Sequence, residues 1–234
     1  MINLQNNKPV SYTLYPTRLL SLSHGTDRLD CLGTEEKIRA GSLIIDSESV
    51  PLYCYTVKSG KVMAYSNTYS GNTVIYSIME EGSMMLEANA LMKKPALVNF
   101  KAMTDTTLVK IPRDRLMEEM IRNPAVMQDV LESISYKFFG TSDQLRQSQA
   151  HSVGWRTCNL LLIYADKHGV NYDGKFLIKE KLSQQIMADM LGANRITIVH
   201  ELKALKEMGF VEQINGYYCV RDIEALKRHM EQIE

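Results

Sequence analysis

Two patterns of hydrophobic and polar positions divide the chain into a strand-rich first half and a helix-rich second half. Between residues 41 and 111, short apolar runs with alternating polar positions are separated by turn residues, which is typical of β-strands. The runs cover residues 43–46, 52–57, 61–66, 73–78, 98–103 and 107–111. Their spacing predicts a small barrel or β-roll. The residues before them are less regular, and one interpretation places a short helix over residues 17–22.

After Pro112 the apolar residues follow helical spacing. One helical pattern covers residues 113–121, and a longer one begins after Asn123 and Pro124. Along the longer helix, apolar residues recur every three or four positions and form a stripe, which consists of Met127, Leu131, Ile134, Phe138 and Leu145. Such a stripe belongs either to the core of a domain or to the interface of a dimer, and the sequence leaves both open.

A short polar segment, residues 148–154, follows the long helix and predicts a domain boundary. An apolar helix over residues 155–165 comes next. The turn residues at 171–174 then lead into a short strand over residues 175–179.

The segment 182–205 shows two short helical patterns on either side of Gly192, a residue that can adopt the positive φ of a sharp turn. Beyond it, Asn215 and Gly216 separate two strand-like runs, and Asn-Gly is the strongest two-residue hairpin signal. A helix pair followed by such a hairpin predicts a winged helix-turn-helix.

Composition narrows the classes of protein. The 27 Lys and Arg residues balance 27 Asp and Glu residues, so the net charge gives no general argument for binding nucleic acid. No segment approaches the run of about 18 apolar residues that a membrane span needs, and no apolar signal-peptide core is found. The four cysteines are scattered without metal-ligand spacing. We therefore expect a cytoplasmic protein with no disulfide framework and no metal site.

The order of these elements resembles that of the Crp/Fnr superfamily of bacterial transcription regulators. The similarity is most specific in the helix-turn-helix, where nine residues match the family pattern: Gln185, Ala188, Leu191, Gly192, Arg195, Thr197, Leu202, Leu205 and Gly209. The resemblance implies an α+β fold with a jelly-roll-like β-roll that senses an effector (residues 1–123). It also implies a long dimerisation helix (124–148) and a C-terminal winged helix-turn-helix domain that binds DNA (149–234).

The resemblance also assigns roles at the DNA. Arg195 corresponds to the base-reading arginine of the family, and its forked guanidinium suits O6 and N7 of guanine. Ile196 stands where the family often has Glu, and His200 stands where a second Arg is common, so we expect a different half-site that still contains guanine. Contacts to phosphate are expected from Ser183, Gln185, Asn194 and Thr197. Helix capping is the alternative role for these residues, and for Ser183 the two roles can coexist.

The effector site departs further from the family. Glu87 corresponds to the acid that binds ribose, but Ala96 and Leu97 occupy the place of the Arg-Ser pair that binds the cyclic phosphate. A buried phosphate without partners is costly, so cyclic AMP is disfavoured unless Lys93 or Lys94 substitutes. The effector, if one is needed, is an unknown small molecule. No heme ligand can be assigned to the five histidines.

The leading prediction is therefore a homodimer, joined through Met127, Leu131, Ile134 and Phe138, that binds a palindromic site in double-stranded DNA. RNA polymerase is a further candidate partner. Because the C-terminal third carries no net charge, the alternative is a ligand-binding sensor that acts through protein–protein contacts. No nucleophile–base set or phosphate-binding loop indicates an enzyme.

Overall fold

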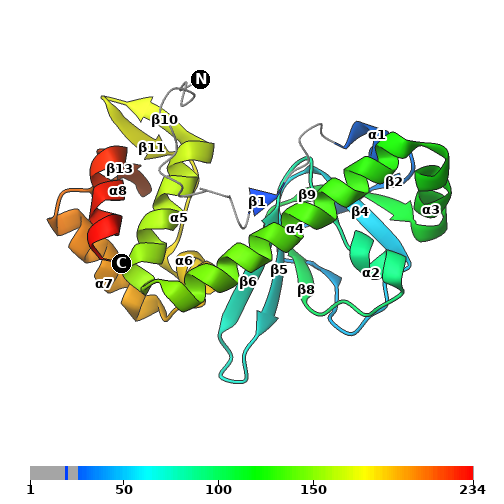
Figure 1. The fold of residues 1–234 in the computed structure, drawn as a ribbon, viewed down its shortest axis with the longest axis horizontal. Helices are drawn as coiled ribbons and strands as arrows, with labels where there is room; N and C mark the ends of the chain where they lie inside the picture. The colour runs from blue at the N-terminus through cyan, green and yellow to red at the C-terminus, as the bar shows by residue number, and fades with distance from the viewer. Residues whose placement is uncertain (1–18, 21–25, 234) are drawn as a thin grey trace.

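The computed structural model describes residues 19–20 and 26–233 (Figure 1). A β-rich N-terminal domain is followed by a long helix, α4 (Pro124–Ala150), which leads to a smaller C-terminal domain. Figure 1 shows α4 running diagonally along the N-terminal domain. The predicted α+β architecture is confirmed.

Two sheets form the N-terminal β-roll. The five-stranded sheet has the order β1 (Leu19–Leu20), β6 (Thr73–Met79), β5 (Val62–Asn67), β8 (Asn99–Ala102) and β3 (Leu43–Ile45). The four-stranded sheet has the order β2 (Thr34–Ile38), β9 (Thr106–Pro112), β4 (Tyr53–Ser59) and β7 (Met84–Met85). Apolar side chains from both sheets pack together, with Val57 and Leu108 from one and Val62 from the other fully buried.

Each of the six predicted runs contains a strand, because a short apolar run between turn residues is a local signal. The short helix expected over residues 17–22 is wrong at Leu19 and Leu20, which form β1 and pair in parallel with β6. The remainder of that segment lies outside the described residues. Elements with few buried positions were not predicted: α1 (Asp27–Asp30), β2, β7 and α2 (Glu87–Met92).

Helix α3 (Arg113–Arg122) is followed at once by α4, whose first turn has a well-defined cap. Asn123 accepts a hydrogen bond from the backbone N–H of Ala125, and Pro124 occupies the first helical position, where its missing N–H costs nothing. The helix ends at Ala150, and Ser152 then caps α5 (Val153–His168). The polar segment predicted as a hinge thus coincides with the break between α4 and α5.

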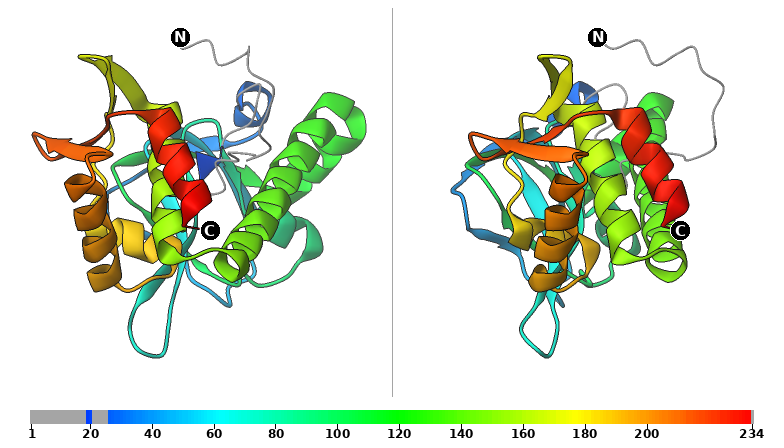
Figure 2. Two further views of the ribbon diagram at one scale, coloured as in Figure 1. Left: turned by 60° about the vertical axis from the view of Figure 1, so that its left-hand side comes forward. Right: turned by 90° about the vertical axis from the view of Figure 1, so that its left-hand side faces the viewer.

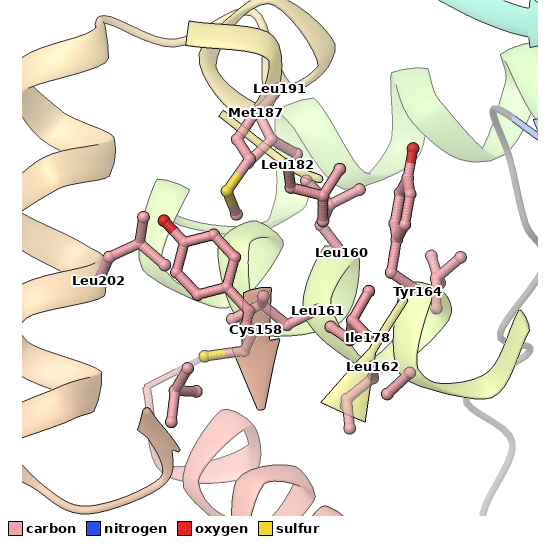
Figure 3. Packing of buried hydrophobic residues seen from close by; sticks show 14 of the residues in the cluster. Cys158, Leu160, Leu161, Leu162, Tyr164, Ile178, Leu182, Met187, Leu191 and Leu202 are labelled. Atoms are coloured by element: carbon pink, nitrogen blue, oxygen red, sulfur yellow. The ribbon is translucent and has the colours of Figure 1, made fainter. Parts of the chain in front are cut away.

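The C-terminal domain packs four helices, α5 to α8, with a four-stranded sheet of order β10-β11-β13-β12. Its elements after α5 are β10 (Gly169–Tyr172), β11 (Lys175–Ile178), α6 (Gln184–Leu191), α7 (Arg195–Glu207), β12 (Val211–Ile214), β13 (Tyr217–Val220) and α8 (Ile223–Gln232). Figure 3 shows Leu161, Met187 and Leu202 converging from three helices in the core. Asn215 and Gly216 both have positive φ, as a two-residue hairpin turn requires. The predicted winged helix-turn-helix is therefore present, with α8 as an addition.

Candidate DNA-binding surface and effector cavity

The helix-turn-helix is built by caps at both helices. Ser183 Oγ accepts from the N–H of Ile186 at 3.1 Å and starts α6, which ends at Gly192 with φ of +57°. Asn194 Oδ1 accepts from the N–H of Ile196 at 2.8 Å and starts α7. These bonds satisfy N–H groups that the first helical turn leaves without partners. The sequence therefore fixes the angle between the two helices locally.

The three residues predicted to read bases lie on the exposed side of α7 near its N-terminus. Arg195 and His200 are exposed, and Ile196 is 66% exposed although it is apolar. In Figure 1 and in the left view of Figure 2, α7 lies at the outer margin of the C-terminal domain, away from α4. Nothing within the described part of the chain pairs with the Arg195 guanidinium. This face is therefore open to a partner.

The four predicted phosphate contacts differ in availability. Ser183 and Asn194 carry the caps just described, which is the alternative role foreseen for them. Gln185 donates to Asp189 Oδ1 at 2.7 Å and is exposed, while Thr197 is half-buried. All four lie at the N-terminal ends of α6 and α7, where backbone N–H groups favour anions.

The cations of the C-terminal domain differ in whether they are paired with an acid. Lys175 and Arg221 both pair with Glu212, at 2.8 and 2.6 Å, so the cations at the wing are neutralised within the domain. In the described part of the chain, Lys179 and Arg195 form no ion pair. Two cations that the domain leaves without an ion pair therefore lie just before and within the helix-turn-helix.

A cavity of about 170 Å³ lies between the five-stranded sheet and helices α2 and α4. Its lining is largely apolar and includes Ala64, Met79, Leu86, Val98 and Phe100. Polar lining groups come from Tyr76, Ser77, Glu87, Asn89, Lys137 and Thr141. A mainly apolar pocket with a few polar groups is the usual form of a small-molecule site.

Glu87 is 1% exposed and is the buried acid of this cavity. Its Oε1 accepts a hydrogen bond from Ser133 Oγ at 2.8 Å and forms an ion pair with Lys137, and both partners come from α4. Lys137 Nζ also donates to the carbonyl oxygen of Met84 at 2.8 Å. The carboxylate is thus neutralised inside the protein. Neither Ser133 nor Lys137 was predicted as a partner of Glu87. The only signal in the sequence is that these two polar residues stand four positions apart on one helix.

The other predicted pocket residues lie elsewhere. Leu97 is 89% exposed and does not line the cavity, which corrects its assignment as a pocket residue. Ala96 is buried in the core of the β-roll behind the cavity. Lys93 and Lys94, considered as substitutes for the missing arginine, are exposed and do not line the cavity. Lys93 ends α2 in a left-handed conformation.

The C-terminal domain rests on the β-roll through an apolar contact with β6. Ile75 and Ile78 are buried in the same cluster as the core residues of the C-terminal domain. Helix α6 is the element of the C-terminal domain that packs against this strand. The core of the DNA-binding domain therefore continues into the sensor domain.

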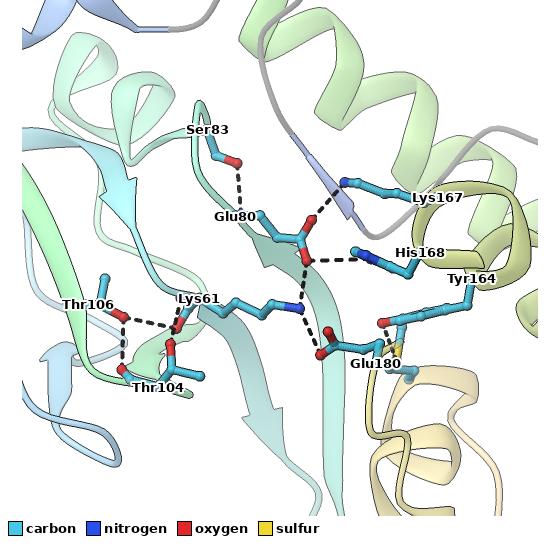
Figure 4. Close-up of polar contacts among 10 residues, drawn as sticks. Lys61, Glu80, Ser83, Thr104, Thr106, Tyr164, Lys167, His168 and Glu180 are labelled. Carbon is cyan, nitrogen blue, oxygen red and sulfur yellow. Dashed lines mark hydrogen bonds and ion pairs between the residues drawn. The ribbon is translucent and has the colours of Figure 1, made fainter. Parts of the chain in front are cut away.

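An ion cluster borders this contact (Figure 4). Glu80, directly after β6, pairs with Lys61 of the β-roll at 2.9 Å and with Lys167 of α5 at 2.8 Å. Lys61 also reaches Glu180 of the C-terminal domain at 2.7 Å. Burial opposes ionisation of Glu80, but the hydrogen bonds and charges of Lys167 and Lys61 outweigh it and lower its pKa. His168 lies 3.8 Å from Glu80, and burial lowers its pKa as well.

The apolar stripe of α4 lies mostly on the surface. Met127, Leu131, Phe138 and Leu145 are exposed, with Leu131 and Phe138 at 55% and 66%. Ile134 is half-buried against the core of the β-roll. The neighbouring face of α4 carries Val126, Val130, Ser133 and Lys137 toward the β-roll. The four exposed side chains therefore form a stripe that the protomer itself leaves uncovered.

Two further searches covered the described residues. No group of three or more His, Cys, Asp or Glu side chains is arranged to hold a metal ion there. Among the same residues, no helix combines the length and apolar character needed to cross a membrane.

Comparison with known protein families supports both domains. Residues 35–123 match the description Cyclic nucleotide-binding domain, and residues 156–229 match Crp-like helix-turn-helix domain. The CRP-like cAMP-activated global transcriptional regulator of Mycobacterium tuberculosis is 23% identical over 174 residues, which cover 74% of this chain and 78% of that protein. The global nitrogen regulator of Synechococcus elongatus is 23% identical over 155 residues, which cover 65% and 70%.

Solved structures share the fold. A mutant of CooA from Carboxydothermus hydrogenoformans has a TM-score of 0.76 at 18% identity, covering 87% of this chain and 90% of that one. The c-di-GMP-responsive regulator CLP of Xanthomonas campestris has a TM-score of 0.74 at 14% identity, covering 84% and 97%. With a cyclic-nucleotide-binding-like domain, a long helix and a DNA-binding helix-turn-helix in this order, the chain belongs to the Crp/Fnr superfamily of transcription regulators.

Proposed function

We propose that this protein is a homodimeric transcription regulator that binds a palindromic DNA site and is controlled through the cavity of its β-roll. The observation that carries the proposal is the exposed N-terminal face of α7, where Arg195 is unpaired beside Ile196 and His200. A recognition helix contacts base edges with residues at this end. Arginine binding to guanine is the commonest specific contact in the major groove.

Ile196 and His200 refine the expected half-site. An exposed isoleucine cannot accept a hydrogen bond from cytosine, but it can contact the methyl group of thymine. Ser183, Gln185, Asn194 and Thr197 would set the register on phosphates through side chains and helix N-termini. The half-site should therefore combine a guanine read by Arg195 with a neighbouring A·T pair.

The DNA experiment is a selection of binding sites from a random library with purified protein, followed by titration of the selected duplex. Arg195→Ala should weaken binding by about 1–3 kcal/mol, or roughly 5- to 150-fold, and relax the preference at one base pair of each half-site. Arg228→Ala is the matched control, because it removes an exposed arginine from α8 in the same domain. Equal effects of the two substitutions, or no palindrome in the selected sites, would refute the proposal.

The dimer would form through the exposed stripe of α4. Two copies of this helix would bury Leu131 and Phe138 against each other and place the two recognition helices in successive major grooves, about 34 Å apart. Phe138→Asp should convert a dimer to a monomer in analytical ultracentrifugation. Tyr136→Asp, on the opposite side of the same helix, should leave the dimer intact. A monomeric parent protein, or a dimer that Phe138→Asp leaves unchanged, would refute this interface.

The effector is proposed to be a molecule other than cyclic AMP. In the described part of the chain, no arginine lines the cavity, and its single lysine is already paired with Glu87.

The second candidate function, a sensor that acts through protein contacts, is favoured by the balanced charge of the C-terminal domain. The DNA titration separates the two, because a protein-binding sensor would show no affinity for the selected duplex. The name of the tuberculosis relative keeps cyclic AMP itself as a ligand that must be tested.

A further inference from the structure

We infer that the β-roll cavity binds an uncharged molecule about the size of one six-membered ring, with a polar group that both donates and accepts hydrogen bonds. This inference rests on the proposed function in taking the cavity as the effector site. It goes beyond that function by naming the chemical class of the ligand. Three observations carry it: the charge balance of the lining, the cavity volume and the origin of the polar groups.

The lining carries no unpaired charge. Among the residues that the structure describes, Glu87 and Lys137 are its only charged side chains, and they form an ion pair with each other. Ser133 and the carbonyl oxygen of Met84 complete their hydrogen bonds. A buried pair satisfied in this way contributes a strong local dipole but no net charge.

A charged ligand would have to break this pair. An anion that took Lys137 would leave buried Glu87 with only the Ser133 hydroxyl group as its partner, and a cation that took Glu87 would leave Lys137, whose side chain is 28% exposed, with the carbonyl oxygen of Met84. Removing one partner from a buried ion pair is strongly destabilising, because an uncompensated charge remains. A neutral group such as an amide or a hydroxyl can instead hydrogen-bond to the outer side of the pair and leave it intact.

The size of the ligand follows from the volume. The cavity measures about 170 Å³, and an apolar cavity of about 150 Å³ in another protein binds benzene. Apolar side chains line one part of the cavity, including Ala64, Met79 and Phe100. A planar or saturated ring would fill this part and place its polar substituent toward Lys137.

The site is also positioned to influence the long helix. Lys137 and Thr141 both come from α4, whereas Ala64 and Phe100 come from the sheet. A ligand between them would contact the β-roll and α4 at the same time. Binding would therefore bias the position of the helix on which the proposed dimer depends.

The test compares two probes of the same shape and different charge, benzamide and benzoate, by calorimetric titration of the full-length protein. Wild-type protein should bind benzamide with a Kd on the order of 1 mM or tighter, and at least about tenfold more tightly than benzoate. Ala64→Leu, which fills the cavity, should abolish binding of both probes. Leu97→Ala, on the exposed loop outside the cavity, is the matched control and should bind as the wild type does.

A second experiment tests whether removal of the carboxylate reverses the preference between the two probes. Glu87→Gln keeps the shape of the side chain but leaves Lys137 without its carboxylate, so this variant should prefer benzoate to benzamide. Circular dichroism of each variant confirms that it is folded before titration. Tighter binding of benzoate or cyclic AMP than of benzamide to the wild type, absence of saturable benzamide binding, or an unchanged preference in folded Glu87→Gln would each overturn the inference.

The outcome is separable from that of the proposed function. DNA binding and its dependence on Arg195 are measured without any probe. Loss of DNA binding with intact benzamide selectivity would overturn the proposed regulator alone. Intact DNA binding with the wrong probe preference would overturn only the ligand class.

Discussion

Replacing Glu80 by glutamine tests whether the ion cluster holds the DNA-binding domain on the β-roll. The substitution keeps the size of the side chain and removes the charge that joins Lys61 to Lys167. Glu80 has 12% of its side chain exposed, and the two lysines have 22% and 28% exposed. Glu80 therefore lies between a surface pair, which contributes about 0–1 kcal/mol, and a fully buried pair, whose disruption costs about 3–5 kcal/mol.

We expect Glu80→Gln to destabilise the docked state by about 2 kcal/mol, because Lys61 keeps Glu180 as a partner while Lys167 loses its carboxylate. For a chain of this size that corresponds to a fall in Tm of roughly 4–8 °C. The assay is thermal unfolding followed by the fluorescence of Trp155, the only tryptophan, which stacks on His151 at the start of α5 with ring centroids 3.8 Å apart.

The control is Glu35→Gln, which removes the acid of an exposed pair with Lys58 inside the β-roll. That variant should unfold close to the wild type. High salt should also lower the Tm of the wild type toward that of Glu80→Gln, because the cluster is only partly shielded from solvent. If Glu80→Gln and Glu35→Gln have equal Tm values, the cluster does not stabilise the domain contact and the reasoning fails.

Three other predictions use the same structure. Burial lowers the pKa of His168, so the stability that neutral His168 contributes is present above its ordinary pKa of 6.5 and is lost as the pH falls below that value. His168→Gln should therefore reduce the loss of Tm between neutral pH and pH of about 5.5. The same substitution at exposed His200 should leave that loss unchanged. A thiol reagent at pH of about 8 should label one cysteine per native chain, the exposed Cys31. Cys219 is buried, and burial raises the pKa of Cys54 and Cys158 to about 12. Labelling of a second thiol would contradict the packing. Leu161→Ala should cost about 2–5 kcal/mol by opening a void in the core of Figure 3, whereas Leu97→Ala, at a side chain that is 89% exposed, should change little in chemical denaturation.

Local patterns explain what the sequence predicted well. Burial alternates along β5, and β4 is a short apolar run with four consecutive buried residues. The caps of α6 and α7 depend on residues within three positions. By contrast, β2 has the pattern TEEKI with four exposed residues, so no apolar periodicity marks it. It is a strand only because β9 pairs with it along its full length.

The sites were predicted unevenly for the same reason. Arg195 and its neighbours follow each other on one helix, so their shared face could be inferred from spacing alone. Glu87 and Lys137 are 50 positions apart, and Glu80 meets Lys167 only because two domains pack together. Leu97 is exposed although its neighbour Ala96 is buried, and in the irregular segment between α2 and β8 no periodicity of the sequence indicates which side chain points inward.

Strand β6 relates the cavity to the DNA-binding domain more directly than the long helix does. Ile75 and Ile78 pack into the C-terminal core, and Glu80 continues the strand into the ion cluster. Tyr76, Ser77 and Met79 of the same strand line the cavity. Coupling between two sites requires an element whose position both of them bias. A ligand that displaced β6 would act directly on the contact between the two domains. Gln144 of α4 donates a hydrogen bond to the carbonyl oxygen of Tyr76 at 2.9 Å. The same displacement would therefore also reach α4, the proposed dimer helix.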